Sequence, residues 1–212
     1  MNEFTYCLST EVIFGKNAEN QTSRLIKSFG GHKVLVVYGG GSVIKSGLLE
    51  KIRHQMEDAG LQTILFGGAM PNPTLAHARE GIALARQEGT DFILGIGGGS
   101  SLDTAKAIAH GLANPEEDIW SFWAKEKTLQ KTTPMGVILT IPAAGSETSD
   151  SAVLTNEETG RKCGLTSQLN RPLFAILNPV LASTLPPDQI GCGVADIMMH
   201  TLDRYFVPNP ED

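Results

Sequence analysis

The sequence lacks the features of several large protein classes. No apolar run is long enough to cross a bilayer, and the 17 Lys and Arg residues form no dense basic tract. A membrane span needs about 20 consecutive apolar residues, and nucleic-acid binding needs clustered positive charge. The net charge of −6 also disfavours nucleic acid as the main partner. We therefore expect neither a membrane nor a nucleic-acid partner, and a small-molecule substrate fits better.

Cysteine is also scarce. The three cysteines, Cys7, Cys163 and Cys192, are an odd number and contain no Cys-x-x-Cys pair. This pattern disfavours a disulfide framework and a structural zinc site, so we expect reduced thiols. Residues 1–15 have no basic segment followed by an apolar core, as a secretory signal would have. The sequence thus predicts a cytoplasmic globular protein, with one large domain or one domain and part of another.

Continuous apolar runs alternate with amphipathic stretches through most of the chain. The apolar runs, typical of parallel strands buried on both faces, lie at residues 34–38, 64–66, 92–96 and 137–141. The stretches with helical periodicity, each opening at a Ser or Thr suited to capping, lie at 42–59, 74–88 and 100–112. This alternation predicts an α/β fold with a Rossmann-like, doubly wound parallel sheet.

The last third of the chain departs from this pattern. Residues 151–166 contain two short β-rich runs around a polar turn, which predicts a hairpin inserted in the α/β domain. The prolines near Pro186 precede a helical run from about Asp188 to Tyr205. We therefore predict a dinucleotide-binding α/β domain over residues 1–185 and the first helix of a C-terminal all-helical domain over 186–212.

Two glycine runs follow predicted strands and open predicted helices. They are Gly39-Gly40-Gly41-Ser42 and Gly97-Gly98-Gly99-Ser100. Glycine lets the backbone approach a ligand closely, and the helix N-terminus that follows offers unpaired N–H groups to phosphate. Either run alone is as consistent with a simple strand-to-helix turn. Two runs at strand ends of one sheet favour dinucleotide binding, although neither is the G-x-G-x-x-G fingerprint.

Asp196 and His200 stand four residues apart in a predicted helix. Residues at this spacing share a helical face, and carboxylate with imidazole suits Zn²⁺ or Fe²⁺. Two protein ligands are fewer than a catalytic metal site normally uses. On spacing alone, a local hydrogen bond or a surface pair is the more common explanation.

Three motifs together carry a resemblance. They are GGGSSLDTAK at 97–106, TIPAAGSE at 140–147, and the helical pair of Asp196 and His200. This ordered set resembles the iron-containing alcohol dehydrogenases, whose architecture is shared with dehydroquinate synthase. The resemblance runs the length of the chain. The segments YGGGS at 38–42 and PAAGSE at 142–147 look most like the NADPH-dependent butanol dehydrogenase and aldehyde reductase branch.

The resemblance implies a role for each motif in cofactor binding. The run Gly97 to Ser100 would hold the pyrophosphate, and Asp103 would organise that loop and the substrate space beside it. Thr140 and Ser146 would line the adenine and nicotinamide sides of the cleft, and Lys162 would reach the ribose or phosphate. Without the resemblance, Asp103 and Lys106 read as a solvated helix pair, Ser146 as an N-cap, and Lys162 as one of two adjacent basic residues in a turn.

The first glycine run bears on the choice of cofactor. NAD-dependent family members resemble other dehydrogenases in placing an acidic residue at this position, where it binds the ribose 2′-OH and repels a 2′-phosphate. Here the position holds the neutral run Gly39 to Ser42, and Lys45 follows one turn later. We therefore predict a preference for NADP(H) over NAD(H).

The resemblance also implies the chemistry. A divalent ion, Fe²⁺ or Zn²⁺, would be bound by Asp196, His200 and two further histidines on later helices, and would act as a Lewis acid during hydride transfer between nicotinamide and an alcohol or aldehyde. With Asp103, this pair forms the predicted catalytic set. The sequence has no later helices, and the remaining histidines, which we expect to be surface or partly buried, are not substitutes: His32, His54, His77 and His110. We expect a fragment of a longer enzyme that binds metal weakly and lacks activity.

Two alternatives remain. One is dehydroquinate synthase-like lyase chemistry, for which the segment around Ser146 lacks the expected basic pocket. The other is a nucleotide-binding module without catalysis. The final helix disfavours it, because its apolar stripe, which includes Ile197 and Leu202, has little to pack against. Such a stripe indicates missing core or a partner subunit. One such partner is a second copy of the chain, in a homodimer whose strand at 4–14 joins the partner's sheet edge.

Overall fold

A single parallel sheet forms the centre of the molecule. The computed structural model describes residues 8–206. Within them, six strands lie in the order β1-β8-β5-β4-β2-β3, and every neighbouring pair is parallel. The strands are β1 (Glu11–Phe14), β2 (Lys33–Tyr38), β3 (Gln62–Phe66), β4 (Phe92–Gly97), β5 (Met135–Leu139) and β8 (Phe174–Leu177). The order reverses between β2 and β4, so this is the predicted doubly wound sheet.

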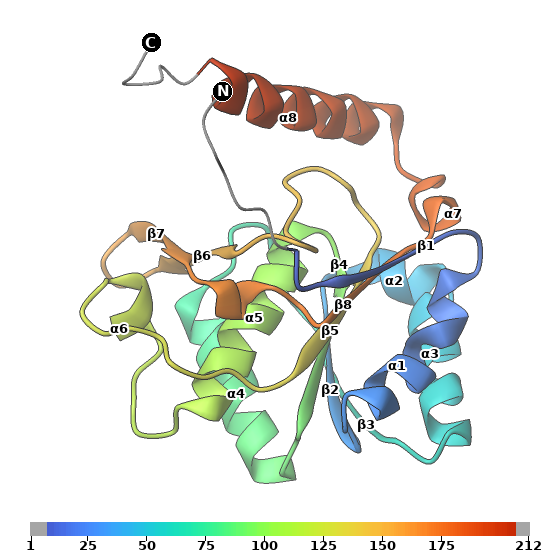
Figure 1. The fold of residues 1–212 in the computed structure, drawn as a ribbon, viewed down its shortest axis with the longest axis horizontal. Coiled ribbons are helices and arrows are strands. Elements are labelled where there is room, and N and C mark those ends of the chain that lie inside the picture. Colours follow the sequence, from blue (N-terminus) through green and yellow to red (C-terminus); the bar gives the residue numbers. More distant parts are fainter. Residues whose placement is uncertain (1–7, 207–212) are drawn as a thin grey trace.

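Helices cover both faces of the sheet (Figure 1). One layer holds η1 (Ala18–Gln21), α1 (Thr22–Ser28), α2 (Gly41–Lys45) and α3 (Leu48–Asp58). The other holds α4 (Leu75–Glu88), α5 (Gly99–Ala113), α6 (Trp120–Trp123) and the antiparallel hairpin of β6 (Ser151–Asn156) and β7 (Arg161–Thr166). The hairpin is as predicted. The chain continues through η2 (Gln168–Asn170), α7 (Pro179–Ala182) and α8 (Pro187–Tyr205).

The sequence of β2 explains this layering. Alternate side chains of a strand point to opposite faces. Leu35 and Val37 pack with α4 and α5, whereas Val34 and Val36 pack with α1 and α3. Because both faces are covered, the strand needs apolar residues at every position, and the same holds for β4, which is buried throughout.

Two predicted elements differ from the structure. The helix expected over residues 42–59 is two helices, α2 and α3, separated by Gly47 with φ of +74°. Glycine adopts this left-handed conformation without the steric cost of a side chain, so it ends one helix and starts the next. The strand expected over 137–141 is Met135–Leu139. Thr140 and Ile141 lie beyond its end and line the cavity described below instead.

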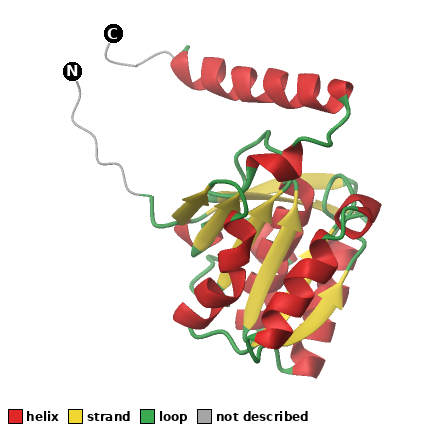
Figure 2. Cartoon of the chain, turned by 90° about the vertical axis from the view of Figure 1, so that its right-hand side faces the viewer, coloured by secondary structure: helices red, strands yellow, loops and turns green. Residues whose placement is uncertain are grey.

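The first and last described elements, β1 and α8, lie at the edge and over one end of the sheet (Figure 2). Residues 4–7 of the strand expected over 4–14, including Cys7, lie outside the described range. The described part, β1, pairs with β8 of its own chain. Helix α8 lies over the end of the sheet to which the strand arrows point (Figure 2). It begins at Pro187, one residue from the predicted start. Among residues 8–206, no helix combines the length and the apolarity of a membrane span.

Candidate cofactor cavity and metal ligands

The two glycine runs meet at one cavity beyond the carboxyl ends of β2 and β4. Its volume is about 370 Å³. It is lined by Gly39, Gly40, Ser42, Val43, Ala69, Pro71, Gly97 to Ser101, Thr140, Ile141, Ala143 and Ala144. The structure therefore brings together eight of the predicted cofactor-binding residues, namely seven from the two glycine runs and Thr140. The eighth glycine-run residue, Gly41, begins α2 and is not in this lining.

Close packing explains why glycine stands at these turns. Gly97 has φ of +150°, and a Cβ on it would lie 2.6 Å from Oγ of Ser101. A Cβ on Gly39 would lie 3.0 Å from the same atom. Ser101 is buried between the two glycine loops. It was not predicted as a site residue, although it directly follows the second run.

The cavity contains the N-terminus of a long helix. Helix α5 starts at Gly99, and its N-cap Gly98 provides no side-chain cap. The first N–H groups of a helix have no partner within the helix, and the helix dipole makes this end positive. Such an end can bind the oxygens of a phosphate group.

A second cavity, of about 220 Å³, adjoins the first. The two share Ser42, Val43, Thr140 and Ile141, and the far wall comes from Val180, Leu181, Thr184 and Leu185. Thr140 thus lies at the junction of both cavities. The two cavities therefore lie side by side at the carboxyl end of the sheet.

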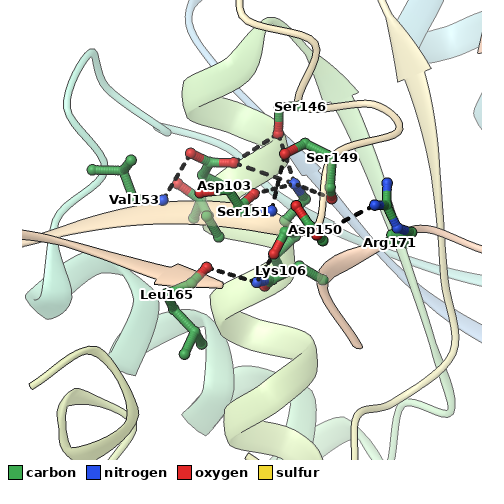
Figure 3. A network of polar contacts seen from close by, with 12 residues as sticks. Asp103, Lys106, Ser146, Ser149, Asp150, Ser151, Val153, Leu165 and Arg171 are labelled. Carbon is green, nitrogen blue, oxygen red and sulfur yellow. Dashed lines mark hydrogen bonds and ion pairs between the residues drawn. The ribbon is translucent and has the colours of Figure 1, made fainter. Parts of the chain in front are cut away.

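A buried polar network lies beside the first cavity (Figure 3). The Lys106 ammonium donates to Oγ of Ser146 at 2.9 Å and to the carbonyl of Ser151 at 2.8 Å. Ser146 donates to Oδ1 of Asp103 at 2.7 Å, and the other carboxylate oxygen accepts from the N–H of Val153 at 3.0 Å. Asp103 and Lys106 are therefore not a solvated helix pair, and Ser146 is not an exposed cap.

The buried environment of Lys106 disfavours the charged form of its side chain. The side chain is fully buried. Burial lowers its pKa below the ordinary value, while the carboxylate of Asp103, 3.6 Å away, opposes that shift. Ser146 lies against these two groups and is not part of the cavity lining. Its hydroxyl links the loop that lines the cavity to Asp103 and Lys106 of α5.

Lys162 lies on β7 and is not among the residues that line the cavity. Its ammonium donates to Oδ1 of Asn72 at 2.8 Å. Asn72 follows Pro71, which lines the cavity, and the N–H of Thr155 donates to the carbonyl of Pro73 at 2.8 Å. The hairpin therefore contacts the loop after β3, and Lys162 binds a residue next to the cavity lining, not the lining itself.

Asp196 and His200 lie on one face of α8. His200 Nε2 is 3.7 Å from Asp196 Oδ1, and the two side chains are about half exposed. Their donor atoms suit a divalent ion of the Zn²⁺ or Fe²⁺ class. No group of three or more His, Cys, Asp and Glu side chains with metal-binding geometry occurs among residues 8–206. The pair therefore has the donor atoms for two ligands of such a site and does not form a complete site among the described residues.

One of the remaining histidines is not where we expected it. His110 is completely buried, whereas a surface or partly buried position was predicted. Nδ1 lies 2.8 Å from the hydroxyl of Thr132, and Nε2 lies 2.8 Å from Oδ1 of Asn170. Its burial was missed because both partners come from segments distant in sequence. The position is structural, beneath the hairpin.

Comparison with known proteins places these features in a family. Residues 9–179 match the model of the iron-containing alcohol dehydrogenase family. A probable NADH-dependent butanol dehydrogenase of Bacillus subtilis is 38% identical over 97% of this chain and 52% of its own length. The NADPH-dependent aldehyde reductase YqhD of Escherichia coli is 38% identical over 100% of this chain and 54% of its own length.

Solved structures agree with the fold. The NADH-dependent butanol dehydrogenase A of Thermotoga maritima superposes with a TM-score of 0.93 at 36% identity, covering 97% of this chain and 52% of that one. The aldehyde reductase YqhD of E. coli gives 0.87 at 36% identity, with 99% and 53% covered. The chain spans about half the length of the relatives it matches. By the family match across most of its residues, it belongs to the iron-containing alcohol dehydrogenase family.

Proposed function

We propose that the whole protein is a metal-dependent, NADPH-linked alcohol dehydrogenase or aldehyde reductase. It transfers hydride between nicotinamide and a primary alcohol or aldehyde. The observation that carries the proposal is the single cavity where both glycine runs meet the uncapped N-terminus of α5. A pyrophosphate placed at Gly97 to Ser100 would gain unpaired N–H donors, and the adjoining cavity, lined by apolar and hydroxyl side chains, would take the rest of the dinucleotide.

The proposed division of labour follows the two predicted segments. Residues 1–185 bind the dinucleotide, and residues 186–212 begin the helical part that binds metal. Asp103 organises the loop around Ser146 and the substrate space, while Lys162 meets the ribose or phosphate. Asp196 and His200 provide a carboxylate oxygen and an imidazole nitrogen to the ion. When bound, a divalent ion polarises the carbonyl oxygen or stabilises the alkoxide.

The preference for NADPH rests on the first glycine run. No acidic side chain occurs between Gly39 and Lys45. A Cβ on Gly41 would lie 3.4 Å from Cε and 4.0 Å from Nζ of Lys45, so the lysine side chain folds back over the start of α2. An ammonium at this position attracts a 2′-phosphate and has no equivalent partner in NADH.

Cofactor titration tests this preference. We expect NADPH to bind more tightly than NADH at matched salt, and Lys45→Ala to weaken NADPH binding roughly tenfold, the loss of one partly solvated charge pair, without changing NADH binding. Lys27→Ala, at an exposed lysine of α1, is the control. Protein fluorescence or calorimetry gives both dissociation constants. Equal or tighter binding of NADH would refute the preference.

Metal analysis of the whole protein tests the ligands. Asp196→Ala and His200→Ala should each lower the bound iron or zinc and abolish reduction of a test aldehyde such as butanal. Asp203→Ala, at an exposed carboxylate on the same helix, should do neither. Elemental analysis of the purified variants decides the point, since undiminished metal in Asp196→Ala would remove that residue from the ligand set.

A further inference from the structure

The loop between β5 and β6 forms one wall of the cavity without regular secondary structure of its own. Residues 140–150 connect Leu139 to Ser151, and Thr140, Ile141, Ala143 and Ala144 line the cavity. Loops of this length are normally mobile unless side chains tie them down. A cavity that selects a ligand by shape needs this wall in a fixed position, so the contacts that hold it matter for binding.

Lys106 makes the contacts on the inner side of this loop (Figure 3). Its ammonium has three acceptors, namely the hydroxyl of Ser146 at 2.9 Å and the carbonyls of Ser149 at 3.4 Å and Ser151 at 2.8 Å. All three belong to the loop or to the first residue after it. Lys106 itself lies on α5, the helix whose N-terminus forms the floor of the cavity.

Asp103 fixes the direction of these bonds. An ammonium can only donate, so the Ser146 hydroxyl accepts from Lys106 and must donate its own proton to Asp103. The second oxygen of Asp103 binds the N–H of Val153 on β6. From the outside, Arg171 binds the carbonyl of Thr148 and the carboxylate of Asp150. Lys106 is thus the inner anchor of the loop, because all three hydrogen bonds of its ammonium go to the loop or to the residue that follows it.

A buried ammonium is not an efficient source of stability. Removing a lysine from water is costly, and well-packed apolar side chains of similar volume often stabilise a fold as well or better. What an apolar side chain cannot do is hold two carbonyls and a hydroxyl in one arrangement. We propose that Lys106 is a positioning residue, which holds the 140–150 loop against α5 so that the cavity keeps its dinucleotide-binding shape. The proposal rests on the proposed cofactor function.

Lys106→Met tests this directly, because methionine has similar length but no donors. We expect NADPH to bind at least about tenfold more weakly, as three charge-assisted bonds are lost. Amide hydrogen exchange of residues 143–151 should rise while that of β2 and β4 stays unchanged. Lys33→Met is the matched control, since its partly buried ammonium pairs with Glu88 at the other end of β2. It should alter neither measurement.

A purely structural role would give a different pattern. Lys106→Met would then lower the urea midpoint and raise exchange across the whole sheet, with the dissociation constant of the folded protein unchanged. That result would overturn the proposal. If the wild-type protein bound neither NADPH nor NADH, the proposed function would fail, and the exchange of residues 143–151 would still decide whether Lys106 holds the loop.

Ser146→Ala provides a second variant in case Lys106→Met does not fold. It removes one of the three acceptors and leaves the two carbonyls in place. Faster exchange confined to residues 143–151, with weaker NADPH binding, would support the proposal. Unchanged exchange and binding in this variant would overturn it. In the double variant, the two losses should be less than additive, because both substitutions break the same contact.

Discussion

His110 makes the stability of the fold depend on pH. The imidazole is completely buried against Asn170 and Thr132. The side-chain nitrogen of Asn170 donates to the carbonyls of Asp150 and Leu165, both at 2.8 Å, so its oxygen faces His110. That oxygen must accept from Nε2–H, which leaves Nδ1 as the acceptor for the Thr132 hydroxyl. The arrangement is complete with a neutral ring and has no place for a second ring proton.

The size of the effect follows from the pKa. Burial lowers the pKa of His110 from 6.5 to about 4, against a smaller opposing effect of the bond to Asn170. Below pH 6.5 His110 of the unfolded chain binds a proton, whereas His110 of the folded chain stays neutral until the pH falls to about 4. The contribution of the neutral His110 to the free energy of unfolding is therefore fully present above pH 6.5 and is lost as the pH falls towards 4. At 1.36 kcal/mol per pKa unit the full loss is about 3 kcal/mol, of which about 2 kcal/mol has occurred by pH 5.

Urea unfolding of the wild-type chain and His110→Gln between pH 7.5 and 5 tests this linkage. The variant is less stable at neutral pH, because glutamine cannot fill the ring's space, but it cannot take up the proton. Its stability deficit should therefore shrink by about 2 kcal/mol on acidification. His54→Gln, at an exposed histidine of α3, is the control for the exchange itself. A deficit that stays constant over this range would refute the assignment of a low pKa to His110.

Two further predictions concern glycines. Gly136→Ala should destabilise the fold by about 1–3 kcal/mol in urea unfolding, because a Cβ at this position of β5 would lie 2.2 Å from the buried ring of Phe174. Gly193→Ala should displace α8, since its Cβ would lie 2.9 Å from the carbonyl of Pro142, whereas Gly191→Ala meets no atom within 4 Å and should only favour the helix. Hydrogen exchange of α8 distinguishes the two variants, and equal behaviour would contradict the predicted contact.

Local features of the sequence predict most of the fold. The continuous apolar runs give β2 and β4 because strands buried on both faces need apolar residues throughout. Helix α4 is found where Thr74 stands as a capping residue, with its hydroxyl accepting from the N–H of His77 at 3.4 Å. The errors in element boundaries arise where a local pattern continues past the end of the element. Gly47 interrupts an unbroken helical periodicity, and Ile141 continues an apolar run past the end of its strand.

The candidate site is only partly predictable in the same way. The glycine runs are local signals, since each turn forms from consecutive residues. The hydrogen-bond partners of Lys106 are 40 or more residues away in the sequence, and those of His110 are 22 and 60 residues away, so no local pattern indicates that either side chain is buried. Lys106 looks like the polar half of a surface helix pair when only Asp103 is considered. Its true partners become evident only once the loop at Ser146 is placed beside α5.

The 140–150 loop is shared by the cavity and the candidate metal ligands. It lines the cavity with Ala143 and Ala144, Lys106 holds it from within, and its Pro142 carbonyl meets α8 at Gly193. Gly193 is the buried residue of that helix, three residues before Asp196. Helix α8 therefore approaches the same loop that lines the cavity. A substitution at Lys106 should therefore shift the candidate metal ligands on α8 through the contact between Pro142 and Gly193. A substitution at Gly193 should shift the cavity wall through the same contact.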